Sequence, residues 1–598
     1  MGKTIIEKIL GSHSGRDVNP GEIVDITIDV RAARDFGGAN VVKNLQDAGL
    51  GINDPGKTAF TFDCNPGGSD QKYATNQQIC RNFAREQGFI IFDITNGIGT
   101  HLAIEKGLAI PGSTLLSTDS HANIMGSIGA FGQGMGDVDI AHAFAHGRVW
   151  FKVPPTAKVI FKGTPSPAAA PKDMVLAMAK ETGANGLLGY AAEVYGPVID
   201  KLGLSGRITM ASMATEMAGI IMLFPPNKEV LDYCSKARGE KVEPVLADDD
   251  AEYVKVIEID VEGLTPRISR PGHPEDVIPV SEVAGTKIGS AFIGSCTNGR
   301  FEDMKAAADI LRGRKVAPGV ILKIVPATDE VWKRCLSEGL MQVFKEAGAL
   351  VGNAGCAGCA AGQIGQNGPG EITISTGNRN FAGKQGKGEV YLASPATVAA
   401  SAVAGAIALP DAIPDTPALF EEGTGKGAAG KAAKKDVGER PTKFKGRVWV
   451  IEEDNIDTDM IFHNRYLTIT DISEMGKCTF DNLKGWENFA EKAELGDIVI
   501  VGKNFGAGSS RQQAVDCFES LGVSLIIGES FGAIYERNAI NKGFPIVTAD
   551  LLSKGLKDGD VIDVDLSTGN IKLPSGEEIS GAFSDVQMDI YKRGGLLN

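Results

Sequence analysis

Residues 289–300, GSAFIGSCTNGR, place a short apolar run directly before a cysteine. The run Ala291–Gly294 is bounded by small residues, which predicts a buried strand. Cys296 follows among small and polar residues that leave its thiolate reachable. We therefore expect a reachable thiol directly after a buried strand.

Strand-like and helix-like runs alternate along the whole chain, which predicts packed α/β layers. The clearest strands are expected at residues 89–94, 291–294, 321–326, 447–451, 497–501 and 523–527, and the clearest helices at 303–312 and 395–408. The fold class is therefore α/β, with several domains.

A segment without a periodic apolar face divides a larger part of the chain from a smaller one. Residues 421–435 read EEGTGKGAAGKAAKK, which is linker composition. At roughly 150 residues per domain, a chain of this length has about four domains. We expect two α/β domains in residues 1–285, a third in 286–410, a flexible linker in 411–442 and a small domain in 443–598.

The composition excludes several classes of protein. Of the 598 residues, 43% are hydrophobic and 23% are charged, as in ordinary globular proteins. The net charge of −15 makes binding to nucleic acid or to an anionic membrane unfavourable. No apolar run is long enough to span a membrane. Nine cysteines are too few for a disulfide scaffold, so a reducing cytoplasm is the expected location.

Residues 51–58, GINDPGKT, match the phosphate-loop pattern and raise the alternative of an NTPase. A phosphate loop needs a strand before it and a helix after it, so that helix amides meet the phosphates. Here the preceding run has a helical pattern and the following run alternates like a strand. We therefore expect a simple helix-to-strand turn, with no nucleotide role for Lys57.

Cys356 and Cys359 form a C-A-G-C pair among glycines, 60 residues after Cys296. Such a pair alone is compatible with a redox, zinc or iron–sulfur site. A zinc site would need a fourth ligand, and no histidine lies between His273 and His463. Three thiolates on an iron–sulfur cubane would leave one iron open, able to act as a Lewis acid.

Eight motifs together resemble the aconitase superfamily, which includes aconitate hydratase, 3-isopropylmalate dehydratase and homoaconitase. They are STDSHAN (117–123), GSCTNGR (294–300), GCAGC (355–359), GNRNFAGKQG (377–386), YLASPATVAASAVAG (391–405), DNIDTDMI (454–461), FGAGSSRQQA (505–514) and GGLLN (594–598). The proportions are similar to separate large and small subunits of the isopropylmalate type, joined by the linker. The resemblance implies a hydro-lyase with a [4Fe-4S] cluster on Cys296, Cys356 and Cys359, plus a small swivel domain.

The resemblance also implies roles for individual residues. Ser509 would be the base that removes the substrate proton. Arg379 would grip a substrate carboxylate through its planar fork. His101 and His121 would be catalytic members of carboxylate–histidine pairs near the departing hydroxyl, with Asp119 and Glu216 as the carboxylate partners. Asp63 would be a further catalytic carboxylate, and the remaining substrate-binding residues would be Ser120, Asn378, Lys384, Ser510 and Arg511. Asp459 would support the site from the small domain.

Three positions depart from the family pattern. Cys64 follows Asp63 where histidine is usual, Ser212 stands where asparagine is common, and Lys384 replaces an arginine. We expect Cys64 to shape the pocket without being an essential acid, because a thiol is mostly protonated at neutral pH.

The expected substrate is a small di- or tricarboxylic 2-hydroxy acid, with 3-isopropylmalate favoured. The tip of the loop at 465–470, Thr468-Ile469, favours an uncharged side group on the substrate. Arg465 lies close by, so a tricarboxylic substrate remains an alternative. Aconitate hydratase, homoaconitase and a dehydratase of another substituted malate remain alternatives. A regulatory RNA-binding relative is the alternative from another class. We expect a monomer or a small homo-oligomer.

Overall fold

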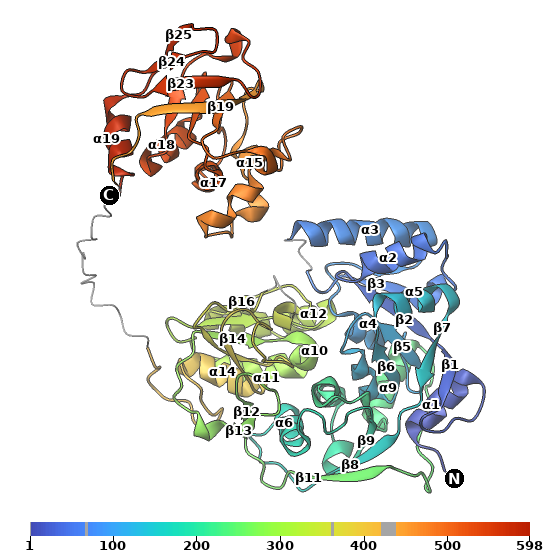
Figure 1. The fold of residues 1–598 in the computed structure, drawn as a ribbon. Coiled ribbons are helices and arrows are strands. Elements are labelled where there is room, and N and C mark those ends of the chain that lie inside the picture. The colour runs from blue at the N-terminus through green and yellow to red at the C-terminus, as the bar shows by residue number, and fades with distance from the viewer. Residues whose placement is uncertain (1, 66–69, 360–363, 420–437, 598) are drawn as a thin grey trace. The chain divides into compact units, whose positions relative to one another are not determined.

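The computed structural model describes residues 2–65, 70–359, 364–419 and 438–597. The chain divides into two compact units, Met1–Glu421 and Glu422–Asn598 (Figure 1). The expected linker at 411–442 contains this division, and its central part lies outside the described residues. Within the described residues, no helix is both long enough and apolar enough to cross a membrane.

The first sheet of the first unit is parallel, in the order β4-β3-β2-β5-β6. Its strands are β2 (Val30–Arg34), β3 (Thr58–Thr61), β4 (Ile90–Phe92), β5 (Thr114–Ser117) and β6 (Phe131–Gly134). Helices α2 (Gly38–Asp47), α3 (Gln71–Gln87) and α5 (Asp137–His146) pack on it through a core rich in phenylalanine. The consequence for function is that β2, β3 and β5 end at the same edge.

A two-stranded sheet of β1 (Ile23–Thr27) and β7 (Arg148–Lys152) and two larger sheets complete the first unit. One has the order β10-β9-β8-β11, with β8 (Thr156–Lys162), β9 (Ala191–Tyr195), β10 (Ile221–Leu223) and β11 (Lys255–Asp260). The other has the order β13-β12-β18-β17-β14-β15-β16, with β12 (Arg267–Ser269), β13 (Val277–Pro279), β14 (Ser290–Ile293), β15 (Ile321–Ile324), β16 (Leu350–Val351), β17 (Ile372–Ser375) and β18 (Glu389–Leu392). This third sheet therefore begins before residue 286, where we expected the domain boundary, because β12 pairs with β18.

Helices fill the spaces between these sheets. Those that position the site are α4 (Gly99–Glu105), α6 (Pro171–Thr182), α8 (Leu204–Ala211), α10 (Ser295–Asn298), α11 (Phe301–Leu311) and α14 (Pro395–Ala404). In the sheet that contains β14, an apolar core packs α11 and α14 against the parallel strands β14, β15 and β17.

The second unit is built on one mixed sheet, in the order β22-β21-β20-β19-β23-β24-β25. Its strands are β19 (Lys443–Ile451), β20 (Ile498–Val501), β21 (Leu525–Gly528), β22 (Ile546–Thr548), β23 (Val561–Asp565), β24 (Asn570–Lys572) and β25 (Glu578–Ser580). The main helices are α17 (Gln513–Leu521), α18 (Ala533–Lys542) and α19 (Asp585–Arg593).

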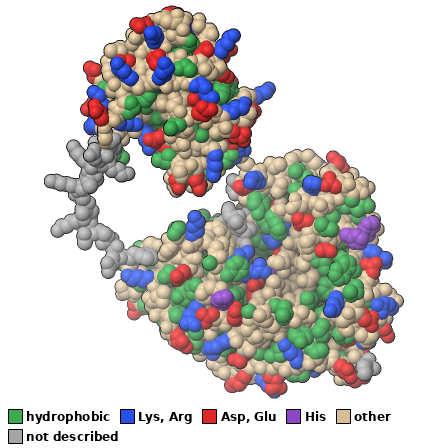
Figure 2. Space-filling view, viewed as in Figure 1, with side chains coloured by type: hydrophobic (Ala, Val, Ile, Leu, Met, Phe, Trp, Pro, Cys, Tyr) green, Lys and Arg blue, Asp and Glu red, His purple; other side chains and the backbone are tan. Residues whose placement is uncertain are grey.

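The predicted α/β class is confirmed, and the predicted strands and helices coincide with observed elements to within a few residues. The phosphate-loop-like segment lies between α2 and β3, as expected for a helix-to-strand turn. On the face seen in Figure 2, acidic and basic side chains are interspersed over both units. That mixed distribution differs from the continuous basic stripe of nucleic-acid-binding proteins.

Candidate active site

Polar side chains gather where three strands of the first parallel sheet end. Arg34 is the last residue of β2, while Asp63 and Asp119 each lie two residues beyond β3 and β5. Carboxyl ends of parallel strands are the usual ligand edge of an α/β sheet. A cavity of about 300 Å³ opens there, lined by Arg34, Phe36, Cys64, Tyr73, Thr118, Asp119, Ser120, His121, Cys296, Cys356, Arg379 and Lys384.

The guanidinium of Arg34 connects three groups of this site. Its Nε donates to Asp63 Oδ1 at 2.7 Å, and its Nη1 lies 3.1 Å from Asp119 Oδ1. Its Nη2 donates to the Sγ of Cys356 at 2.6 Å. The backbone N–H of Arg34 donates to Thr118 Oγ1, which ties the end of β2 to the segment after β5. All three nitrogens of the guanidinium are therefore engaged.

Asp63 and Asp119 respond differently to the same arginine. Both are buried, and burial alone raises a carboxyl pKa. For Asp63 burial outweighs the attraction of Arg34 and raises the pKa to about 6. For Asp119 burial also acts upward, but Arg34 and His121 hold the pKa below its usual range. Asp119 is thus the fixed anion, and Asp63 is the carboxyl that titrates nearer neutral pH.

Cys296 and Cys356 pack in one buried cluster with Ile98 and Ala327. Each lies beside a residue with an unusual backbone: Ser295 has φ 70° and Ala357 has φ 48°. Left-handed conformations at residues other than glycine are costly and gather at functional sites. Of the three predicted cluster ligands, these two share the cavity, while the side chain of Cys359 lies outside the described residues.

Asn378 and His101 hold the loop that carries Cys296. The Asn378 Oδ1 lies 3.6 Å from Cys296 Sγ, and its Nδ2 donates to the backbone oxygen of Ser212. His101 is fully buried, and its Nε2 lies 2.9 Å from the backbone oxygen of Cys296. Burial lowers the pKa of His101 to about 3, so this imidazole is neutral.

The expected carboxylate partner of His101 is absent among the described residues. Its second nitrogen, Nδ1, is buried and makes no hydrogen bond there. The pair expected at His101 is therefore not formed among the described residues, because α4 directs the ring to a backbone carbonyl. His101 also does not line the cavity.

The second predicted pair is present. His121 Nε2 lies 3.1 Å from Glu216 Oε1, and His121 Nδ1 lies 3.9 Å from Asp119 Oδ1. Arg379 Nε donates to both oxygens of Glu216 at 3.0 Å. Burial acts to raise the Glu216 pKa, but His121 and Arg379 bring it below its usual value. Glu216 therefore orients an imidazole and a guanidinium together.

The three departures from the family pattern lie in or beside this site. Cys64 lines the cavity, and its Sγ lies 3.5 Å from Asp63 Oδ1. Burial is the main cause that raises the pKa of Cys64, and the negative charge of Asp63 raises it further. Lys384 also lines the cavity. Ser212 is buried, donates to the Thr209 carbonyl and accepts from Asn378 through its backbone oxygen.

The serine motif of the second unit precedes a helix. Ser509 and Ser510 are exposed, and α17 begins only at Gln513, so the serines lie in the loop ahead of the helix. Thr458 Oγ1 donates to the backbone oxygen of Ser509 at 3.1 Å. Gly508 has φ +95°, and a Cβ there would lie 2.4 Å from Asp457 Oδ2. The loop therefore requires glycine at this position.

Arg511 is buried, unlike the two serines that precede it. Its Nη1 and Nη2 lie 2.5 and 2.6 Å from the two oxygens of Asp459. The predicted supporting role of Asp459 thus has a geometric basis within the second unit: it holds the fork of Arg511 in a fixed orientation. Arg465 is likewise paired, with Asp481.

Sequence reasoning missed two residues of the first-unit site. Arg34 had a signal, since the charged pair Arg34-Asp35 stands at the end of a buried strand. Lys172 on α6 had none, because a single lysine in an amphipathic helix is usually exposed. It is fully buried and donates to the backbone oxygen of Gly377 at 2.8 Å, beside the segment of Asn378 and Arg379.

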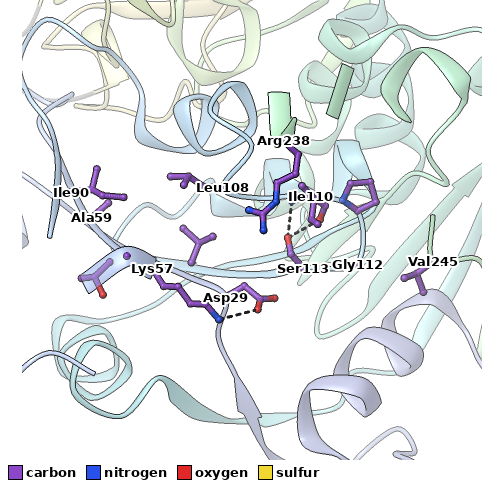
Figure 3. A pocket seen from close by; sticks show the side chains of 14 residues that line it. Asp29, Lys57, Ala59, Ile90, Leu108, Ile110, Gly112, Ser113, Arg238 and Val245 are labelled. Carbon is purple, nitrogen blue, oxygen red and sulfur yellow. Dashed lines mark hydrogen bonds and ion pairs between the residues drawn. The ribbon is translucent and has the colours of Figure 1, made fainter. Parts of the chain in front are cut away.

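The phosphate-loop-like turn belongs to a different pocket. Lys57 lies near Asp29, at 3.9 Å, in a cavity of about 380 Å³ that Arg238 and Ser113 also line (Figure 3). The residues come from the starts of β2, β3 and β5, the opposite edge of the sheet from Arg34. No helix begins after the turn, so the arrangement that holds nucleotide phosphates is missing from this described segment.

Comparison with known families identifies the class of this protein. The family model for the aconitase family (aconitate hydratase) matches residues 7–405, and that for the aconitase C-terminal domain matches residues 425–550. The chain belongs to the aconitase family, and it is a hydro-lyase.

Several individual relatives are similar to parts of this chain. The 3-isopropylmalate dehydratase large subunit 1 of Methanopyrus kandleri is 41% identical over 414 residues, covering 69% of this chain and 99% of the relative. The 3-isopropylmalate dehydratase large subunit of Sulfurihydrogenibium sp. is 39% identical over 428 residues, covering 71% and 98%. A solved 3-isopropylmalate dehydratase structure from Methanocaldococcus jannaschii is 34% identical, with a TM-score of 0.24, and covers 26% of this chain and 91% of its own.

Proposed function

We propose that this hydro-lyase dehydrates and rehydrates a small di- or tricarboxylic 2-hydroxy acid by means of a [4Fe-4S] cluster, and that 3-isopropylmalate is the favoured substrate. The observation that carries the proposal is the 300 Å³ cavity, which joins two cysteines to the Arg34–Asp119 and His121–Glu216–Arg379 networks. The large-subunit relatives support the choice of substrate.

The described residues fit an iron–sulfur cluster. Two thiols share one cavity, and a strained backbone beside each fixes its loop. No other described cysteine lines the cavity except Cys64. We assign Cys296, Cys356 and Cys359 as the ligands. When bound, a cluster with three protein ligands supplies an open iron that polarises the departing hydroxyl as a Lewis acid.

The cavity residues would bind and orient the substrate. Arg379 lines the cavity and Glu216 engages its Nε, so Nη1 and Nη2 can take a carboxylate bidentately. Lys384 offers a point charge, and Ser120 a hydroxyl, for a second polar group. In the second unit we assign Ser510 and Arg511 to substrate carboxylate, with Asp459 orienting the arginine.

Protons would move at three groups. Ser509 is the proposed base at the carbon, because its exposed hydroxyl lies in a glycine loop near the cationic Arg511. His121, oriented by Glu216, is the proposed proton donor to the leaving oxygen. Asp63, with a pKa raised to about 6 by burial, can hold a proton next to Arg34. His101 supports the Cys296 loop, which is a revision of the role expected for it.

Two features favour an uncharged side group on the substrate. Cys64 replaces an imidazole with a smaller and less polar group at the cavity wall. Arg465 is the cation that could have bound the third carboxylate of a tricarboxylic substrate, but it is already paired with Asp481. Both features agree with an alkyl-substituted malate. The buried free cysteines suit a reducing cytoplasm, where we propose that the enzyme works.

An anaerobic substrate panel tests the proposal. Reconstituted enzyme is given 3-isopropylmalate, citrate, isocitrate, homoisocitrate, citramalate and dimethylmalate, and the absorbance of the unsaturated product is followed. We expect the highest kcat/KM with 3-isopropylmalate. A higher value with citrate or homoisocitrate would replace the substrate assignment, and no turnover of any hydroxy acid would overturn the proposed function.

A further inference from the structure

The fork of Arg34 is saturated by groups of the protein itself. Its side chain is only 10% exposed, and its three nitrogens face Asp63, Asp119 and Cys356. A substrate carboxylate would have to displace one of these acids before it could bind the guanidinium. Arg34 therefore differs from Arg379, which meets a single carboxylate through Nε.

We propose that Arg34 is a positioning residue that hydrogen-bonds the cluster ligand Cys356 and makes the cluster more resistant to oxidation. The inference rests on the proposed function, because it assumes the cluster on Cys356. It assigns Arg34 to the metal centre and not to the substrate.

The contact joins two layers of the first unit. Arg34 ends β2 in the first sheet, whereas Cys356 follows β16 of the third sheet. A second hydrogen bond runs in parallel, from the backbone N–H of Cys356 to the backbone oxygen of Asp63 at 2.9 Å. Asp63 is itself fixed by Gly99 N–H and by Arg34. The cysteine is thus held from the first sheet at both its backbone and its sulfur.

The expected electronic effect follows from charge. Each reduction step adds negative charge to an iron–sulfur cluster, and hydrogen bonds to its sulfurs raise its potential. A guanidinium that donates to a ligand sulfur therefore favours the more reduced form. The nearby acids do not remove the effect, because they hold the guanidinium so that one N–H points at the sulfur.

Geometry also explains the choice of arginine. A lysine ammonium is a compact point charge and has no planar fork. It could not place donors on Asp63, Asp119 and Cys356 at the separations observed. We expect Arg34→Lys to keep the charge but weaken the contact to sulfur.

The test compares cluster lifetime and potential in purified protein under argon. Wild type, Arg34→Gln and Arg34→Lys are exposed to ferricyanide, which takes one electron from the cluster and leads to release of one ferrous ion. The three-iron product is followed by electron paramagnetic resonance and the released iron by a chelator. We expect release from Arg34→Gln to be about tenfold faster or more, a barrier change of about 1.4 kcal/mol, because the charge-assisted hydrogen bond to the ligand sulfur is lost. The midpoint potential should shift downward, and Arg34→Lys should be intermediate.

Arg81→Gln is the matched control. Arg81 makes a two-pronged pair with Asp93 on the first layer but does not line the cavity. Its cluster should decay at the wild-type rate. Equal decay and potential in wild type and Arg34→Gln would overturn this inference alone. If Arg34→Gln does not fold, equal decay in Arg34→Lys would overturn it instead. A wild type that binds no cluster would overturn the proposed cofactor and this inference together.

Discussion

The site of the first unit and the serine motif of the second are built in opposite ways. In the first, Arg34, Asp63, Asp119 and Glu216 are buried or nearly so, and every one is held by at least one charged neighbour. In the second, Ser509, the proposed base, is exposed in a glycine loop. A buried network is fixed before substrate arrives, whereas an exposed loop residue depends on its backbone for placement.

The difference lies in what holds the side chains of each site in place. Charged groups in a low-dielectric interior interact strongly and resist movement. The serine loop relies on Gly508, on the Thr458 contact and on the Arg511–Asp459 pair. Substitutions in the first region should therefore affect both stability and activity, and those in the second mainly activity.

The largest effect is expected at the cysteines of the buried region. Cys296→Ser should abolish the cluster and the activity, because it removes one of three proposed ligands. Iron and acid-labile sulfide, measured after anaerobic reconstitution, check this. Cys335→Ser, at a buried cysteine of another core, is the control and should keep both. A full cluster in Cys296→Ser would break the assignment.

Next is Ser509 in the exposed region. Ser509→Ala should lower kcat by about 10²- to 10⁴-fold, the usual range for general acid–base catalysis, with a modest change in KM. Its unfolding temperature should equal that of wild type, since the side chain is exposed. The control is Ser553→Ala, an exposed serine of the same unit. Near-normal turnover of Ser509→Ala would remove Ser509 as the base.

Glu216 tests whether the buried network also stabilises the fold. Glu216→Gln should lower the free energy of unfolding at pH 7 by about 3 kcal/mol, because it leaves Arg379 and His121 without their anion. Since the folded pKa of Glu216 is depressed, the wild-type advantage is present above the unfolded pKa and is lost as pH falls through the folded value. Calorimetry at pH 7 and at acid pH measures the difference. An advantage that grew toward acid pH would contradict this assignment.

The smallest effect is expected at Cys64. Cys64→Ala should keep at least about a tenth of the activity, a barrier change of about 1.4 kcal/mol or less. The reason is that burial raises the pKa of this thiol, so it stays protonated and shapes the cavity. Steady-state kinetics on protein with equal iron content checks it. A loss as large as that of Ser509→Ala would make the thiol catalytic.

The sequence by itself determined the layered fold, the division into two units and the family. Short apolar runs between glycines predicted strands such as β14 and β20, because local hydrophobic patterning is a property of neighbouring residues. The family resemblance of the motifs implied Cys296, Cys356 and the pair His121–Glu216. Both cysteines line the cavity, and His121 lies 3.1 Å from Glu216.

Only the tertiary structure decided which partners these residues have. Arg34 meets Cys356 across 322 positions of sequence, and His101 meets the carbonyl of Cys296 across 195. No local pattern contains such contacts, because they arise from the packing of separate sheets. Burial was equally hidden: Asp63 and Asp119 look alike in sequence, yet their pKa values move in opposite directions. Burial and two neighbouring carboxylates, Asp35 and Asp119, raise the pKa of Asp63, whereas Arg34 and His121 outweigh burial at Asp119 and lower its pKa.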